Sequence, residues 1–197
     1  MASDYDDELW ALVPDEPAPP PAHLVRFVGS LGRREGAVLD LGCGDGRLTP
    51  ALRGRHIVGA DVSPVALERA GTRLSGQDIE LVEIHPGAVM PFDDEAFDLV
   101  LAAETIEHVV DVEALLGEAR RVLRPGGELA LTTPAHSRRT GASVLLRGFA
   151  RRFDPLAPHV RFFSRASLSA VLHDGGFEVR SLRRRRGTLL ARAVRTG

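Results

Sequence analysis

Three glycines at alternate positions form the densest chemical signal in the chain. Gly42, Gly44 and Gly46 come directly after the apolar run 37–41. Glycine tolerates positive φ, and its missing Cβ lets a ligand approach the backbone closely, so such a turn after a buried strand is typical of a cofactor site. The amide hydrogens at the start of a following helix would then face the ligand.

Two aspartates accompany this turn at informative distances. Asp40 lies two positions before Gly42, which places a carboxylate at the mouth of the expected cleft. Asp61 ends the next apolar run, roughly 20 residues further on, where a carboxylate can accept hydrogen bonds from both hydroxyls of a ribose. The pattern therefore predicts a nucleoside-containing cofactor.

A nicotinamide cofactor is the alternative for a glycine-rich turn. Its fingerprint, G-x-G-x-x-G, requires a glycine at position 47. This chain has Arg47 there and a glycine at position 46 instead. The spacing therefore disfavours a dehydrogenase.

A second group of reactive side chains follows the apolar run 97–102. Glu104, Glu107 and His108 are spaced three and four residues apart, so on a helical turn they would share one face. His159, much later in the chain, could complete a set of ligands for Mg²⁺ or another divalent ion. Two alternatives stay open: His108, with Glu104, acts as a metal-free general base, or Glu104 and His108 only shape the cleft and Glu107 lies on the surface.

The elements that must position these residues alternate between strand and helix. This order predicts a doubly wound α/β fold with a mostly parallel, seven-stranded sheet, helices on both faces and an antiparallel C-terminal hairpin. The expected strands are 37–41, 56–60, 79–84, 97–102, 128–133, 177–182 and 188–194. The expected helices are 23–31, one beginning within 47–53, 64–74, 112–123, which Pro125-Gly126-Gly127 would end, and 164–173.

The chain divides into an N-terminal extension and one domain. Residues 1–22 are expected to form a short helix, 5–12, and a proline-rich linker, and residues 23–197 the domain. Tyr5 and Trp10 could close over the cofactor or simply pack against the domain. The segment 136–163, rich in arginine and phenylalanine, is expected to be a lid on the acceptor side, because long loops are usually functional.

Composition narrows the class of protein. The 197 residues carry a net charge of −2, which argues against a nucleic-acid partner, and no apolar run approaches the roughly 20 residues of a membrane span. The acidic start lacks the apolar core of a secretory signal, and one cysteine, Cys43, excludes an internal disulfide. We therefore expect a cytoplasmic monomer or homodimer.

Several motifs in order resemble those of class I S-adenosylmethionine (SAM) dependent methyltransferases, with a Rossmann-like fold. They are Asp40-Leu-Gly-Cys-Gly-Asp-Gly46, Gly59-Ala-Asp61-Val-Ser63, Pro91-Phe-Asp-Asp-Glu-Ala-Phe-Asp98, Glu104-Thr-Ile-Glu-His-Val109 and Arg121-Val-Leu-Arg-Pro-Gly-Gly127. The likeness covers residues 37–135 closely.

The resemblance implies roles for matching residues in a SAM site. Asp40 would hold the amino group of the methionine portion, and the backbone from Gly42 through Cys43 to Gly44 would pass beneath it. Asp61, followed by Val62, would bind the ribose. Family members often have an acidic residue near the adenine, whereas this chain has His85-Pro86-Gly87-Ala88 there. Backbone groups of Gly87 and Ala88 would then contact the adenine instead, and the affinity for the cofactor would be lower.

The set Glu104, Glu107, His108 and His159 resembles that of metal-assisted O-methyltransferases of ubiquinone biosynthesis and of small-RNA 3′ ends. The rest of the chain is more similar to the general small-molecule group. The resemblance thus implies methyl transfer to an oxygen or nitrogen of a small-molecule acceptor. The alternatives are a non-catalytic SAM-binding or partner-binding protein of the same fold and a small-RNA 2′-O-methyltransferase.

Overall fold

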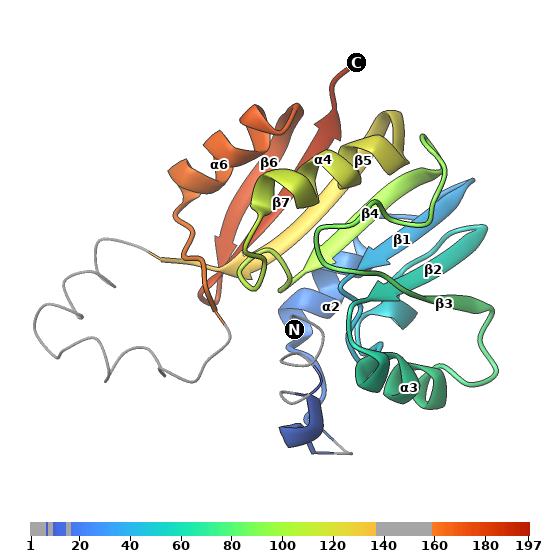
Figure 1. Ribbon diagram of the computed structural model, residues 1–197. Coiled ribbons are helices and arrows are strands. Elements are labelled where there is room, and N and C mark those ends of the chain that lie inside the picture. Colours follow the sequence, from blue (N-terminus) through green and yellow to red (C-terminus); the bar gives the residue numbers. More distant parts are fainter. Residues whose placement is uncertain (1–6, 8–9, 15–16, 137–158) are drawn as a thin grey trace, which may run out of the picture.

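The apolar runs of the sequence become seven strands of one sheet (Figure 1). The computed structural model describes residues 7, 10–14, 17–136 and 159–197. The strands are β1 (Ala37–Leu41), β2 (His56–Asp61), β3 (Ile79–Glu83), β4 (Phe97–Ala103), β5 (Leu123–Pro134), β6 (Phe177–Arg185) and β7 (Thr188–Arg195).

The strand order in the sheet is β3-β2-β1-β4-β5-β7-β6. The strands β1 to β5 run parallel to one another, whereas β7 runs antiparallel to both β5 and β6. The predicted doubly wound, mostly parallel sheet with an antiparallel C-terminal hairpin is thus confirmed. Because the chain moves outward from β1 to β2 and then returns to β4 on the other side, the β1–β4 boundary is the switch point where ligands bind in such sheets.

Helices cover the sheet, and side-chain caps begin three of them. The helices are α2 (Ala22–Gly29), α3 (Pro64–Arg73), α4 (Val112–Val122) and α6 (Arg165–Asp174), with a short 3₁₀ turn η1 (Thr49–Ala51). Ser63 accepts a hydrogen bond from the Ala66 N–H at the start of α3, and Asp111 does the same for α4. Ser164 and Ser167 form a reciprocal capping box at α6, which satisfies amides that the first turn leaves free.

Two separate clusters of apolar side chains line the two faces of the sheet, because successive residues of a strand point in opposite directions. On one face Leu39 of β1 belongs to the cluster that includes Leu116 of α4 and Leu168 of α6. On the other face Val38 packs in the cluster that includes Val28 of α2. The prediction of helices on both faces is confirmed, and β1 is buried between them.

Two local predictions were wrong. The helix expected within 47–53 is only the 3₁₀ turn η1, because Leu52 already returns to extended backbone. The turn expected at Pro125-Gly126-Gly127 lies inside β5. Leu123 pairs with Phe97 and Glu128 with Leu99, so the extra residues between them form a bulge rather than a separate loop.

The ends of the expected extension and lid are only partly described. Asp7 and residues 10–12 are helical, in agreement with the helix expected over 5–12. Tyr5 and residues 137–158 of the expected lid lie outside the described residues. Within the described part of the chain, no helix is long and apolar enough to cross a membrane.

Candidate active site

The glycine turn leaves β1 at the switch point with a backbone that only glycine adopts easily. Gly42 has φ +73° and Gly44 has φ +55°. The N–H groups of Gly42 and Cys43 both donate to the Ala60 carbonyl of β2, at 2.8 and 3.0 Å, which ties the turn to the neighbouring strand. The turn is therefore attached to the carboxyl ends of β1 and β2, at the boundary between β1 and β4.

Neighbouring side chains lie where a side chain at these glycines would be. A Cβ at Gly42 would lie 2.5 Å from Thr105 Cγ2, and one at Gly44 would lie 2.7 Å from Cζ2 of the Trp10 ring. The Thr105 hydroxyl donates to the Leu41 carbonyl at 3.1 Å. The Thr105 contacts join the turn after β1 to the segment after β4. The glycine turn and the residues that follow β4 therefore lie directly against each other in the candidate site.

Asp40 is buried below the turn. Its Oδ2 accepts a 2.7 Å hydrogen bond from the Thr49 hydroxyl of η1. Burial raises the pKa of the Asp40 carboxyl to about 6, while the Thr49 bond lowers it and the nearby Asp61 raises it further. A ligand ammonium group beside Asp40 would restore the ionised form, which is what the predicted role for this residue requires.

Asp61, at the end of β2, connects the glycine turn to α3. Its Oδ2 accepts from the Gly44 N–H at 2.7 Å and its Oδ1 from the Ser63 N–H at 3.0 Å. Burial raises the pKa of Asp61, and the hydrogen bonds from Ser63 and Gly44 oppose that rise. Each carboxylate oxygen keeps a second lone pair, so both can still accept hydroxyl hydrogens from a ribose.

The remaining expected cofactor residues lie around this centre. Val62 is half-buried against the larger apolar cluster. Burial raises the pKa of the Cys43 thiol, so it stays protonated and packs beside Gly59. Gly87 and Ala88 form an exposed turn, with the Ala88 N–H donating to the His85 carbonyl at 3.1 Å.

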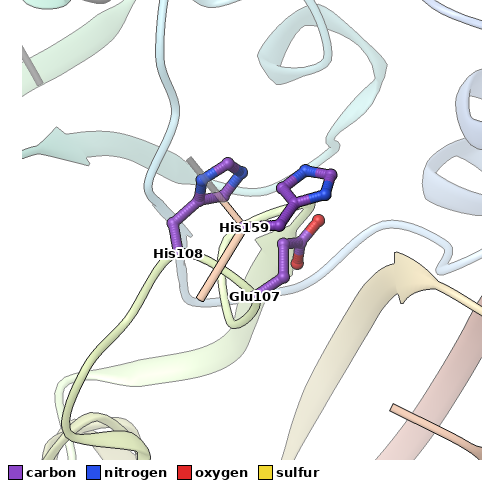
Figure 2. A group of neighbouring side chains, drawn as sticks. All are labelled: Glu107, His108 and His159. Carbon is purple, nitrogen blue, oxygen red and sulfur yellow. The ribbon is translucent and has the colours of Figure 1, made fainter. Parts of the chain in front are cut away.

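On the acceptor side, three of the four expected metal ligands converge. Figure 2 shows Glu107, His108 and His159 turned toward one another, and one ligand atom from each lies within 4.8 Å of the others. The two imidazole rings meet edge to face, with centroids 4.9 Å apart. The segment carrying His159 is held there because the N–H groups of Val160 and Arg161 both donate to the Glu107 carbonyl, at 2.9 and 3.0 Å.

The Glu107 carboxyl is buried, and neither of its oxygens makes a hydrogen bond of acceptable geometry. Burial raises the pKa of Glu107 to about 8, and the charge of Glu104 adds to the rise, while the nearby Thr133 hydroxyl opposes it only weakly. Burial also lowers the pKa of His159, which favours the neutral imidazole that binds metals. A buried, unpaired carboxyl beside two imidazoles fits a divalent ion, since an ion would supply the missing partner.

Glu104 is near Glu107 but is not among the three converging residues, in contrast to the expected set of four. The spacing argument assumed a helical turn, but residues 104–110 form a non-helical turn in which the His108 N–H donates to the Thr105 carbonyl. Glu104 itself has φ +55°, and its Oε1 accepts a 2.8 Å hydrogen bond from the Thr132 hydroxyl of β5. Its side chain therefore joins β4 to β5 beside the site.

Three further residues belong to the site region and were not singled out as binding or catalytic residues from the sequence: Asp7, Thr49 and Thr105. Asp7 accepts from the Ser63 hydroxyl, and Thr49 and Thr105 bond Asp40 and Leu41 respectively. Hydroxyl residues and a lone acid in an acidic segment carry no spacing signal of their own. Only the fold brings them to the two aspartates and the glycine turn.

Comparison with known proteins finds sequences and structures that are similar to this chain. A family model described as a methyltransferase domain matches residues 39–131. The demethylmenaquinone methyltransferase of Clavibacter sepedonicus is 34% identical over 74% of this chain and 57% of its own length. A ubiquinone biosynthesis O-methyltransferase of Pseudomonas putida is 29% identical over 74% of this chain and 66% of its own length. The chain spans about half the length of the curated relatives it matches.

Solved structures agree on the fold. A Bacillus halodurans protein described as a putative methyltransferase superposes with a TM-score of 0.75 over 90% of this chain and 100% of its own, at 18% identity. At that identity the likeness is evidence for the Rossmann-like fold alone. The matched range 39–131 contains the glycine turn, Asp61 and Glu107 but neither His159 nor the N-terminal extension.

Proposed function

We propose, because this chain belongs to the class I SAM-dependent methyltransferase family, that it transfers a methyl group from SAM to a hydroxyl oxygen of a small-molecule acceptor. The observation that carries the choice of oxygen is the buried, unpaired Glu107 carboxyl beside His108 and His159. An amine acceptor with a free lone pair needs no such group, whereas a hydroxyl must lose a proton.

The cofactor half of the site follows from the turn after β1. The cofactor supplies an electrophilic methyl group on a sulfonium. Asp40 would pair with its ammonium group, the backbone from Gly42 to Gly44 would line its methionine portion, and Asp61 would accept from the ribose hydroxyls. Holding both reactants in line is worth about 7–11 kcal/mol of the barrier in well-oriented systems, so rigid placement is the main contribution of this chain.

The acceptor half would be held by Glu107, His108 and His159. A divalent ion bound by them would lower the pKa of an acceptor hydroxyl in contact with it. The contact between Thr105 and Gly42 supports this assignment, since it brings the turn that carries Glu107 and His108 directly beside the cofactor turn. The relative from Pseudomonas putida is named as an O-methyltransferase, which agrees with an oxygen acceptor.

Methyl transfer from labelled SAM tests this proposal directly. The purified protein is incubated with a panel of small catechols, phenols, alcohols and amines, with Mg²⁺ or Mn²⁺ and with EDTA. We expect labelled product from a hydroxyl acceptor, strong suppression by EDTA, and loss of product in Glu107→Gln. Glu113→Gln serves as the matched control, because Glu113 is exposed in the first turn of α4 and lies outside the group of three.

Other results would redirect the assignment. Methylation only of amines, unaffected by EDTA, would contradict the metal-assisted oxygen chemistry while leaving the family activity in place. Binding of SAM without turnover of any acceptor, including short RNA, would instead favour a non-catalytic SAM-binding protein of this fold.

A further inference from the structure

The N-terminal segment contacts the two elements that would hold the cofactor. Its described residues bond or pack against the glycine turn on one side and α3 on the other. These residues precede the range 39–131 that the family model matches. Four contacts, from Asp7, Trp10, Val13 and Ala18, define how the segment lies.

Asp7 lies at the amino end of α3. Its Oδ1 accepts a hydrogen bond from the Ser63 hydroxyl and a longer one, 3.5 Å, from the Val65 N–H. The helix end stabilises a carboxylate there. Ser63 also donates its backbone N–H to Asp61, and the charge of Asp7 contributes to the raised pKa of Asp61. Two carboxylates therefore flank Ser63, where the family places the ribose.

Trp10 lies against the glycine turn. The edge of its ring, Cζ2 and Cη2, would be 2.7 and 2.9 Å from a Cβ at Gly44, so the indole covers the face that the absent side chain leaves open. Trp10 is half-buried and belongs to neither apolar cluster of the domain. Its packing partner is therefore the turn itself and not the hydrophobic core.

Two arginines of the domain hold the segment in this position. Arg69 of α3 donates to the Val13 carbonyl at 2.8 Å, and Arg47, just after the glycine turn, donates to the Ala18 carbonyl at 3.2 Å. Both anchors lie on the C-terminal side of Trp10, and the bond between Ser63 and Asp7 holds the segment on its N-terminal side.

We propose that Asp7 and Trp10 are part of the cofactor site: Trp10 forms a wall over the methionine end at Gly44, and Asp7 joins Asp61 as a hydroxyl acceptor at the ribose end. This inference rests on the proposed function, because it assumes an adenosyl ligand on the glycine turn. It adds two residues that lie more than 30 positions before that turn and outside the matched domain.

Trp10 is the only tryptophan of the chain, so its fluorescence reports on this contact alone. Titration with S-adenosylhomocysteine, the demethylated product of SAM, is expected to change the emission of Trp10 with the same Kd that calorimetry measures. The Asp61→Ala variant should show neither the heat nor the fluorescence change. Heat of binding in the parent without any change in Trp10 emission would overturn the proposal for Trp10.

Calorimetry on variants provides a second test of the proposal, because it measures how much each side chain contributes to binding. We expect Trp10→Ala and Asp7→Asn each to weaken the Kd for S-adenosylhomocysteine about tenfold, with Trp10→Phe in between. Leu12→Ala is the matched control, because Leu12 lies in the same segment and is 81% exposed. Thermal unfolding of each variant verifies that the domain is folded.

The outcomes separate the two proposals. A parent protein that binds the ligand while Trp10→Ala and Asp7→Asn bind equally well leaves the methyltransferase proposal standing and refutes this one. Tighter binding by Trp10→Ala also refutes it, since the segment would then occupy the site rather than complete it. A folded parent that binds neither SAM nor its product refutes both.

Discussion

The backbone N–H of Gly44 donates a 2.7 Å hydrogen bond to Asp61 Oδ2, which joins the glycine turn after β1 to the acidic residue that ends β2. The two motifs that the sequence separates by 17 residues are therefore one physical unit. Asp61 therefore stabilises the turn by hydrogen bonding, in addition to its expected role in binding a ribose. Any variant at Asp61 must affect both.

Asp61→Ala is expected to lower stability and cofactor affinity together. It leaves the N–H groups of Gly44 and Ser63 without acceptors, and each buried orphan donor costs about 1–3 kcal/mol. Asp61→Asn keeps one acceptor and should cost about half as much. Urea unfolding and calorimetry with S-adenosylhomocysteine measure the two effects. Asp93→Ala, an exposed aspartate, is the control, and equal stability of Asp61→Ala and Asp93→Ala would contradict this stabilising role of Asp61.

Gly42→Ala is expected to be more destabilising than Gly32→Ala, although the two glycines have nearly the same φ, +73° and +78°. Both substitutions strain the backbone by about 1–2 kcal/mol. Only the Cβ at position 42 meets a neighbour, Thr105, whereas nothing lies within 4 Å at position 32. We expect an additional loss of about 1–3 kcal/mol in the free energy of unfolding of Gly42→Ala. Equal losses in the two variants would show that Thr105 moves aside freely.

The buried strands could be predicted closely from the sequence, and the exposed ends could not. The strand 37–41 was predicted residue for residue, because both of its faces are covered and its apolar run is continuous. The strand β6 continues three residues past the expected end at Leu182, through Arg185. At the sheet edge those arginines pair through their backbone while their side chains stay in solvent, so no apolar pattern marks them.

The candidate site shows the same division. The glycine turn and Asp61 could be found because both stand at the carboxyl ends of two consecutive buried strands, β1 and β2. The structure brings Glu107 and His108 together with His159 and not with Glu104, because a spacing of three and four residues gathers side chains only on a helix. Asp7 meets Ser63 across 56 residues, and no local pattern encodes such a contact.

Divalent ions are expected to stabilise the parent protein but not Glu107→Gln. An ion that binds only the folded protein at a hundred times its Kd adds about 2.7 kcal/mol, which corresponds to a rise of several degrees in Tm for a chain of this size. The amide that this substitution introduces is a poorer ligand than the carboxylate and carries no charge. Thermal unfolding with Mg²⁺ or Mn²⁺, against EDTA, measures the effect. Glu104→Gln should keep the ion-dependent rise, and its loss in that variant would place Glu104 among the ligands.

The pH dependence of stability is expected to reveal Asp40. Its pKa in the folded protein is about 6, above the ordinary value of 3.8, so the folded state holds a proton that the unfolded state releases between these values. Stability contributed at this site therefore falls as pH rises from about 4 to 6, and the full penalty, on the order of 2–3 kcal/mol, remains above pH 6.

Asp40→Asn is expected to remove this penalty while keeping an acceptor for the Thr49 hydroxyl. The variant should match the parent near pH 4 and be more stable than the parent at pH 7, as measured by urea unfolding across that range. Its affinity for SAM should nevertheless be lower, because the ionised carboxylate is the expected partner of the ligand ammonium group. In the parent, that affinity should rise as pH increases through about 6, since the ligand must displace the proton on Asp40. Suppose instead that the two proteins show parallel stability curves and the same affinity for SAM. Asp40 would then be ionised across this pH range and would not pair with the ammonium group of the ligand.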